Sequence, residues 1–141
     1  MARSILVPHD GSSHAQAALE YALETFPDAS IVLFHAIDPF EVTPTEEQLS
    51  PLTNAWLADQ ESEAADLFAE AKASLEGGDA SIETATAVGS PAQSIVAHAE
   101  DADADQIVMG SRGRGGAAGL QMGSTAEIVV KRANVPVTVV R

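Results

Sequence analysis

The chain has 141 residues, which is enough for one domain with a substantial hydrophobic core and too few for two ordinary domains. Its 21 acidic residues outnumber its 7 basic residues, and the formal charge of −14 opposes binding to nucleic acids and to anionic membranes. The absence of cysteine excludes disulfides and cysteine-ligated metals. No window approaches the roughly 18 apolar residues of a membrane span, so we expect a soluble, cytoplasmic protein.

The acidic residues are spread along the chain and do not form one block. They recur in four stretches, from Glu20 to Glu24, from Glu41 to Glu47, from Asp59 to Asp66 and from Glu100 to Asp105. We favour a solvating coat of the halophilic kind, as in proteins of salt-accumulating organisms; a surface for a basic partner is the alternative. In both cases a polyphosphate ligand would have to bind against a negative field.

The first part of the chain alternates apolar runs with a helical pattern. Ser4 to Pro8 is a short apolar run, which predicts a strand buried on both faces. A turn and helix cap follow at residues 10–13, and the next helix is expected to end near Phe26, before Pro27. Ser30 to Ile37 predicts a second buried strand.

The middle of the chain predicts a loop, a long helix and a third strand. Three prolines mark residues 38–51 as an exposed loop. A helix is expected from about Leu52 to about Leu75, with Trp56 in the core or at a dimer contact and a glycine pair after its end. The alternation from Ile82 to Val88 predicts a half-exposed strand.

The last part repeats the pattern of helix and strand. Ser90 and Pro91 are expected to open a helix that ends near Glu100. The remaining elements are a strand from Gln106 to Met109, a helix from Ser124 to Ala133 and a strand from Val135 to Val140. Alternating strands and helices predict parallel pairing with right-handed crossovers. We therefore expect one α/β domain over residues 1–141, a doubly wound five-stranded parallel sheet with helices on both faces.

Glycines are dense after the fourth predicted strand. Six lie among the fourteen residues from Gly110 to Gly123, although glycine loses more entropy on folding than any other residue. Ligands of such sheets bind beyond the carboxyl ends of the strands, and glycine-rich loops there bring backbone amides close to phosphates. On glycine content alone, a flexible connection remains the alternative.

The end of this loop favours an anion. Ser124 and Thr125 open the last predicted helix, whose unsatisfied N–H groups and positive dipole end would face the strand ends. Their hydroxyls can add hydrogen bonds, and Arg112 and Arg114 add positive charge. A Walker A loop is excluded because no lysine precedes Ser124, and a Rossmann fingerprint because the first strand lacks the glycine pair that should follow it.

The spacing Gly110-x2-Gly113-x9-Gly123-Ser124 resembles the ATP-binding signature of universal stress proteins. The resemblance covers the whole chain. It includes the opening ILVPHDGS, the second strand LFHAID, the fourth strand IVMGSRG and the ending VPVTVV.

The resemblance implies the fold of the adenine nucleotide alpha hydrolases, with strand order 3-2-1-4-5 and with Asp10 beside Gly110. It also implies a nucleotide site. Pro8 and Asp10 would flank the adenine and ribose, with Asp10 near any Mg²⁺, and the backbone of Ala36 would meet the adenine edge. The ribose and first phosphates would contact Met109, Gly110, Arg112 and Gly113. The outer phosphates would contact Gly123, Ser124 and Thr125.

Ala126 departs from the family pattern, because nucleotide-binding members commonly carry a second hydroxyl two residues after Ser124. Losing one hydrogen bond to a charged oxygen costs about 1.5–3 kcal/mol. Weaker ATP binding, or a preference for ADP or AMP, is therefore open.

None of the histidines is expected to bind a ligand. His35 is predicted to be a satisfied core residue and His9 a solvent-facing residue at a strand end.

We expect a stress-response regulator that binds ATP, ADP or AMP and changes shape or partner on binding. The resemblance implies at most slow ATP hydrolysis or autophosphorylation, and we predict no catalytic residue. The alternative is a dimeric scaffold that binds no nucleotide. The strand from Val135 to Val140 is expected at an edge that invites pairing, and in the family this strand pairs with its symmetry mate. The regulatory partner is not named by the sequence.

Overall fold

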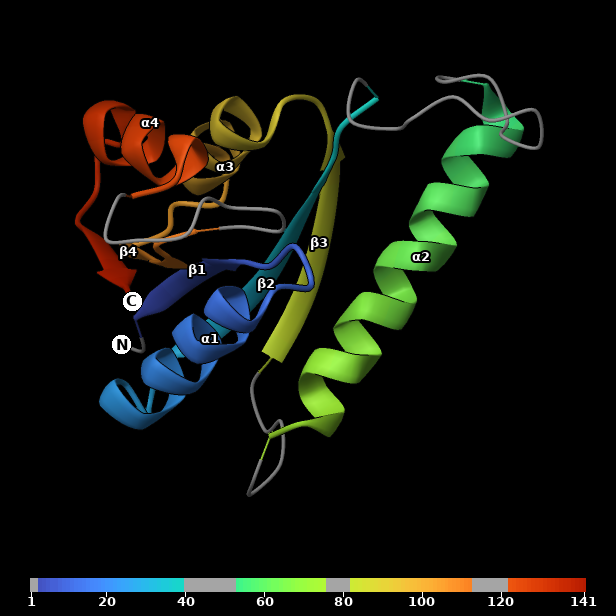
Figure 1. The fold of residues 1–141 in the computed structure, drawn as a ribbon. Coiled ribbons are helices and arrows are strands. Elements are labelled where there is room, and N and C mark those ends of the chain that lie inside the picture. Colours follow the sequence, from blue (N-terminus) through green and yellow to red (C-terminus); the bar gives the residue numbers. More distant parts are fainter. Residues whose placement is uncertain (1–2, 40–52, 76–81, 113–121) are drawn as a thin grey trace.

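The computed structural model describes residues 3–39, 53–75, 82–112 and 122–141. Within these ranges five strands and four helices alternate along the chain (Figure 1). The strands are β1 (Ser4–Pro8), β2 (Ser30–Ile37), β3 (Ile82–Val88), β4 (Gln106–Gly110) and β5 (Val137–Val140). The helices are α1 (Ser13–Thr25), α2 (Asn54–Ala73), α3 (Pro91–Asp101) and α4 (Ser124–Arg132).

The strands form one sheet in the order β3-β2-β1-β4-β5, and every neighbouring pair is parallel. The strand order and the α/β class expected from the sequence are therefore confirmed. The chain builds outwards from β1 to β3 and then crosses to β4 on the other side, so the strand order reverses between β1 and β4. Ligands of open α/β sheets bind in the crevice that such a reversal leaves at the carboxyl ends of the strands.

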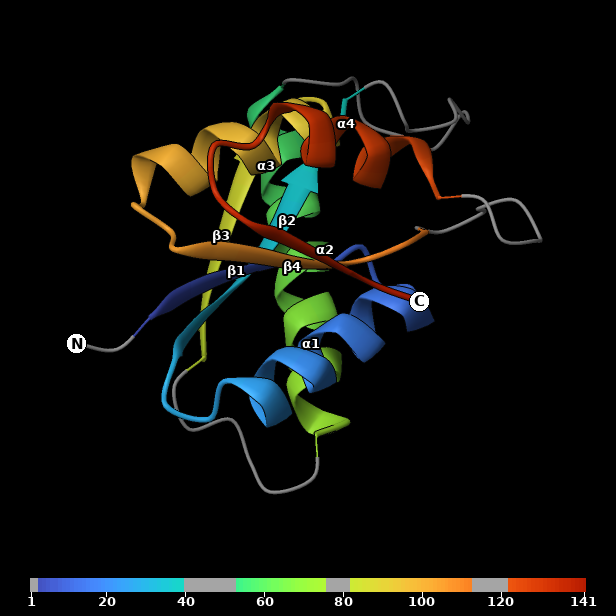
Figure 2. The same ribbon diagram turned by 90° about the vertical axis from the view of Figure 1, so that its left-hand side faces the viewer.

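Helices cover both faces of the sheet (Figure 2). On one face, α1 and α2 form a core with the inward side chains of the strands, which includes Ile5, Leu19 and Phe68. On the other face, α3 and α4 form a second core, which includes Ile95, Ile107 and Val129. Consecutive strand residues alternate between these cores, which is why the central strands read as unbroken apolar runs. None of the described helices is long and apolar enough to cross a membrane.

Two predicted boundaries shift for local reasons. The helix α2 begins at Asn54 and not near Leu52, because the Thr53 side chain accepts a hydrogen bond from the Trp56 amide and caps the helix there. The strand β5 begins at Val137 and not at Val135, although the Pro136 carbonyl already accepts a bond from the Ile107 amide. The predicted loop at residues 40–51 and the glycine pair at 77–78 lie outside the described residues.

The end of β4 lies against the backbone of α1. A Cβ atom at Gly110 would stand 2.7 Å from the His14 carbonyl carbon and 2.8 Å from its oxygen. Real Cβ atoms do not approach backbone this closely, so residue 110 has to be glycine for β4 and α1 to pack as they do. This glycine is explained by packing alone, before any ligand is considered.

We predict that Gly110→Ala lowers the free energy of unfolding by about 1–3 kcal/mol, because the added methyl group forces β4 and α1 apart. Urea unfolding followed by circular dichroism measures the change. The double variant Gly110→Ala with His14→Ala should show the same loss, since the two nearest atoms belong to the His14 backbone. Recovery of stability in the double variant would contradict this explanation.

Candidate functional site

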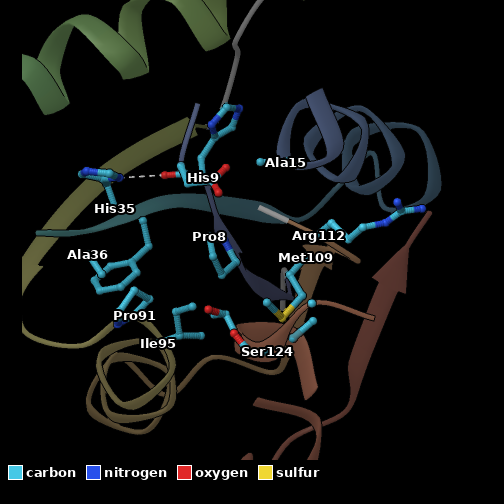
Figure 3. A pocket seen from close by; sticks show the side chains of 16 residues that line it. Pro8, His9, Ala15, His35, Ala36, Pro91, Ile95, Met109, Arg112 and Ser124 are labelled. Atoms are coloured by element: carbon cyan, nitrogen blue, oxygen red, sulfur yellow. Dashed lines mark hydrogen bonds between the residues drawn. The ribbon is translucent and has the colours of Figure 1, made fainter. Parts of the chain in front are cut away.

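A cavity of about 340 Å³ opens at the carboxyl ends of β1, β2 and β4 (Figure 3). Its other walls are the first turns of α3 and α4. Nine of the ten residues predicted to form the site line this cavity, which are Pro8, Asp10, Ala36, Met109, Gly110, Arg112, Gly123, Ser124 and Thr125. The tenth, Gly113, lies outside the described residues. The structure thus brings together residues from both ends of the chain, from Pro8 to Thr125.

The inner part of the cavity is apolar, and Phe34, Ile95, Met109 and Ala126 line it. Of these four residues, the sequence did not single out Phe34 and Ile95. Behind the cavity, the Phe34 ring stacks on His98 of α3, with ring centroids 4.7 Å apart. Neighbouring residues of a strand point to opposite faces of the sheet, so the sequence could separate Phe34 from His35 at the end of β2. It could not show which helix covers each face. An aromatic and aliphatic floor of this kind suits a planar apolar group.

The first turn of α4 supplies the backbone donors of the cavity. The helix begins after Gly123, which has no side chain that could cap it. The first intrahelical bond runs from the Glu127 amide to the Gly123 carbonyl, so the amides of residues 124 to 126 have no acceptor within the helix. Within the described part of the chain no other acceptor meets them. They lie at the positive end of the helix dipole, where an anion is stabilised.

Gly123 itself contributes differently from the expectation. Its amide donates to the Ser111 carbonyl at 2.7 Å, so this N–H group is already used within the protein. That bond closes the two ends of the glycine-rich loop against each other. The contact is tight as well, since a Cβ atom at Gly123 would stand 3.3 Å from the Ser111 oxygen. The amides without an acceptor at the start of α4 therefore begin one residue later, at Ser124.

The α1 helix begins at the same edge of the sheet, but its start is occupied. The Ser12 hydroxyl accepts from the Ala15 amide at 3.1 Å and caps the helix. The Ser12 amide in turn donates to Asp10 Oδ1 at 2.9 Å. Asp10 is thereby held at the mouth of the cavity, and it is the one carboxylate among the described residues that line it.

Arg112 lines the cavity, but its charged end lies elsewhere. In Figure 3 the side chain runs away from Ser124 and Met109, towards the end of β5. In this conformation Arg112 contributes its backbone and the base of its side chain to the wall. The expectation that its guanidinium adds charge at the phosphate site would need a different rotamer.

His9 is buried, and the prediction of a solvent-facing residue is wrong. Its side chain is 5% exposed and lies on the α1 and α2 side of the sheet. Nδ1 accepts from the Gly11 amide at 3.0 Å, and Nε2 lies 2.9 Å from Gln16 Oε1. The His9 carbonyl accepts from His35 Nδ1 at 2.9 Å, so the predicted core histidine has a partner at that nitrogen. The position of His9 at the end of a strand did not show that α1 and α2 cover it.

Burial lowers the pKa of His9 from its ordinary value of 6.5. The hydrogen bond with Gln16 and the negative charge of Asp10 oppose this shift, and the neighbouring His35 adds to it. The hydrogen bonds agree with a neutral ring. Because Nδ1 accepts from a backbone N–H, the single proton belongs on Nε2, which donates to Gln16.

The described residues do not form a metal centre of their own. No three histidine, aspartate or glutamate side chains among them gather closely enough to hold a metal ion. A single carboxylate such as Asp10 can still contribute to a magnesium ion that is bound mainly by phosphates and water.

The sheet order, the position of the cavity and the open start of α4 define a doubly wound α/β protein with a cavity at the point where its strand order reverses. The profile of the Universal stress protein family matches residues 1–141. The chain is 34% identical over 143 residues to the universal stress protein MJ0531 of Methanocaldococcus jannaschii, which covers 99% of this chain and 82% of that relative. This chain belongs to the universal stress protein family.

Solved structures agree with this assignment. The structure of MJ0577 from the same archaeon superposes with a TM-score of 0.78 at 33% identity, covering 99% of this chain and 96% of that one. UspA from Lactobacillus plantarum superposes with a TM-score of 0.79 at 26% identity, covering 99% and 97%. Two more distant family structures, one in complex with cAMP and one from Archaeoglobus fulgidus with dAMP, share the fold with TM-scores of 0.61 and 0.56 at 24% and 19% identity.

The lowered pKa of His9 predicts how stability depends on pH. At a pH between the pKa of His9 in the folded protein and its pKa in the unfolded chain, the unfolded chain binds more protons. The contribution of His9 to the free energy of unfolding is therefore complete above about pH 6.5, and it is lost as the pH falls towards the pKa of the folded protein. One such group changes the free energy of unfolding by at most about 1.4 kcal/mol per pH unit.

The matched variant is His9→Gln, which cannot titrate. We expect the stability advantage of the wild type over this variant to shrink as the pH falls from about 7.5 to about 5, measured by urea unfolding at each pH. The carboxylates common to both proteins cancel in this difference. Two stability curves that stay parallel over the range would contradict a buried neutral His9.

Proposed function

We propose that this chain binds an adenine nucleotide in the cavity between β1, β2, β4 and α4, and that occupancy regulates the protein in the stress response. The observation that carries the proposal is the uncapped start of α4, whose first amides open onto an apolar cavity at the reversal point of the sheet. An apolar floor beside a cluster of backbone donors is the pairing that a base linked to a phosphate requires.

The size and lining of the cavity support a nucleoside as the ligand. A volume of about 340 Å³ lies at the lower end of the range for small-molecule pockets, about 300–1,000 Å³. Phe34, Ala36 and Met109 offer a planar apolar group a floor, while Asp10 at the mouth can accept hydrogen bonds from ribose hydroxyls. The base end and the sugar end of the ligand would thus meet different chemistry.

The amides of residues 124 to 126 support a phosphate at the other end. Ala126 lacks the hydroxyl that the family pattern leads one to expect, but its backbone N–H remains and its methyl group packs in the α3 and α4 core, 2% exposed. The phosphate seat would therefore be built from main chain, with hydroxyls at Ser124 and Thr125 alone. Family structures in complex with cAMP and with dAMP support the adenine nucleotide class.

Mg²⁺ would enter with the phosphates of ADP or ATP, with Asp10 as its protein ligand. Among the described residues that line the cavity, Asp10 is the one carboxylate, and a magnesium ion typically keeps several waters and takes one or two carboxylates besides phosphate oxygens. The described lining of the cavity contains no second carboxylate and no lysine that could share in catalysis with Asp10. We therefore propose a binding protein, with at most slow hydrolysis.

A proline at the start of α4 tests the phosphate seat directly. We predict that Ser124→Pro, which removes one amide donor and one hydroxyl, weakens nucleotide binding more than Ser124→Ala, which removes the hydroxyl alone. Proline is favoured at the first helical position, and Gly123 already has the extended conformation (ψ of 158°) that must precede it. A lost hydrogen bond to a charged oxygen is worth about 1.5–3 kcal/mol, or roughly 10–100-fold in affinity.

Calorimetry with AMP, ADP and ATP, each with and without Mg²⁺, gives the affinities of the wild type and both variants. Equal affinities of Ser124→Ala and Ser124→Pro would contradict the proposal that backbone amides at the start of α4 bind the phosphate. No binding of any of the three nucleotides by the wild type would remove the proposed function itself.

We also propose that the protein is a homodimer formed through β5. In the described sheet β5 pairs with β4 alone, and its other edge is open. The Pro136 carbonyl accepts from Ile107 of β4, and the Val140 carbonyl accepts from Ser111, the residue after β4. By the alternation of a parallel ladder, the Val139 amide therefore faces the open edge. Half-buried valines along an open edge favour pairing with a second strand.

Val139→Pro is predicted to abolish the dimer while leaving the fold, because proline is tolerated on an edge strand and removes a donor that faces away from β4. Sedimentation equilibrium measures the mass of both proteins, and circular dichroism checks the fold. A variant that remains dimeric, or a wild type that is monomeric at high concentration, would refute pairing through β5.

A further inference from the structure

The turn that carries Asp10 is held by hydrogen bonds on the side that faces away from the cavity. The Gly11 amide donates to His9 Nδ1 at 3.0 Å, and Gly11 has a φ of +86°, a backbone conformation that side-chain-bearing residues rarely adopt. The Ser12 amide bonds to Asp10 Oδ1 at 2.9 Å within the same turn. His9 is among the residues that line the cavity, but in Figure 3 its ring points away from Met109 and Ser124.

The His9 ring passes this restraint on to two helices. Its Nε2 donates to Gln16 Oε1 of α1 at 2.9 Å, and Gln16 Nε2 donates to the Ala71 carbonyl of α2 at 3.1 Å. In a regular helix Ala71 would accept from the Leu75 amide, but Leu75 donates to the Lys72 carbonyl. The Gln16 side chain therefore takes a carbonyl that the end of α2 leaves available.

This relay has one consistent set of donors and acceptors. The Gly11 N–H fixes Nδ1 as an acceptor, which places the ring proton on Nε2, and the Gln16 amide then has its oxygen towards His9 and its nitrogen towards Ala71. The His9 backbone is held separately, because its carbonyl accepts from His35 Nδ1 at 2.9 Å and its amide donates to the Phe34 carbonyl at 2.7 Å.

We propose that His9 and Gln16 are positioning residues, which hold the turn from Asp10 to Ser12 in the conformation that binds the nucleotide. The choice of ligand rests on the function proposed above. The binding conformation needs a left-handed Gly11, and glycine has many other conformations open to it. If the turn adopts its binding conformation for a tenth of the time, the apparent dissociation constant rises about tenfold.

Two substitutions at His9 separate the positioning role from simple packing. His9→Asn places an amide oxygen close to where Nδ1 lies, so it keeps an acceptor for Gly11 and loses the link to Gln16. His9→Leu fills the space and removes both bonds. We expect the dissociation constant for AMP to rise about tenfold in His9→Leu and to change by less than about threefold in His9→Asn.

Gln16→Met provides a third variant outside the cavity lining, in which the His9 ring keeps its bond to Gly11 but loses its support from α2. The expected rise for AMP lies between those of the other two, because Gln16→Met leaves the buried His9 Nε2–H without an acceptor, whereas His9→Asn removes this N–H together with the ring. All affinities are measured by calorimetry well below the unfolding midpoint of each variant. If His9→Leu does not fold, the comparison of Gln16→Met and His9→Asn with the wild type takes its place.

Amide hydrogen exchange of Gly11 in the nucleotide-free protein gives a readout that does not depend on ligand. The exchange should be fast in His9→Leu and slow in the wild type and in His9→Asn, and ¹⁵N spectra should show the wild-type His9 ring protonated at Nε2 alone. Slow exchange of Gly11 in His9→Leu, or equal AMP affinities for His9→Leu and the wild type, would overturn the proposal. If the wild type binds no adenine nucleotide, the proposed function fails and the Gly11 exchange alone decides whether the turn is held by His9.

Discussion

The close approach of β4 to α1, at Gly110 and His14, is the constraint on which the site depends. A Cβ atom at residue 110 would stand 2.7 Å from the His14 carbonyl carbon, so only glycine fits there. This close packing brings the end of β4 level with the turn after β1. The reversal of strand order between β1 and β4 would leave a crevice in any case. The tight contact on the α1 face closes that crevice on one side, so the cavity opens on the α3 and α4 face, where Phe34, Ile95 and Met109 form its floor.

The charge distribution shows how an anion could bind to an acidic protein. Residues 1–105 contain twenty of the 21 acidic residues and two of the seven basic ones, while residues 106–141 contain five basic residues and a single acid, Glu127. The loop and helix that would hold the phosphates come from this basic part of the chain. Among the described residues that line the cavity, Asp10 is the one carboxylate and Arg112 the one arginine or lysine, so few of the charges behind the formal −14 lie in the cavity wall. Screening by salt also shortens the reach of distant carboxylates to about 8–10 Å at ordinary ionic strength.

The sequence predicted the strands, the strand order and nine residues of the cavity wall because each depends on local or family-wide patterns. Apolar runs show which strands are central, and glycine spacing shows where backbone must come close to something. The sequence could not show the environment of His9, since a strand-end histidine reads alike whether a loop or a helix covers it. It also could not show that the Gly123 amide donates to the Ser111 carbonyl, because that bond joins two residues that are twelve positions apart in the chain.

Gly123 and Ala126 show how this chain can present backbone donors at the cavity without charged side chains at these positions. The Gly123 amide closes the loop on Ser111, and the amides that follow it are presented by the helix geometry of α4. Backbone donors of this kind do not depend on which side chain each residue carries, so the change to alanine at position 126 removes a hydroxyl and leaves an N–H in place. What the chain must preserve is the conformation that brings the donors to the cavity. Glycine at 110 and 123 preserves it through close packing, and the capped turn from Asp10 to Ser12 preserves it from the other side of the crevice.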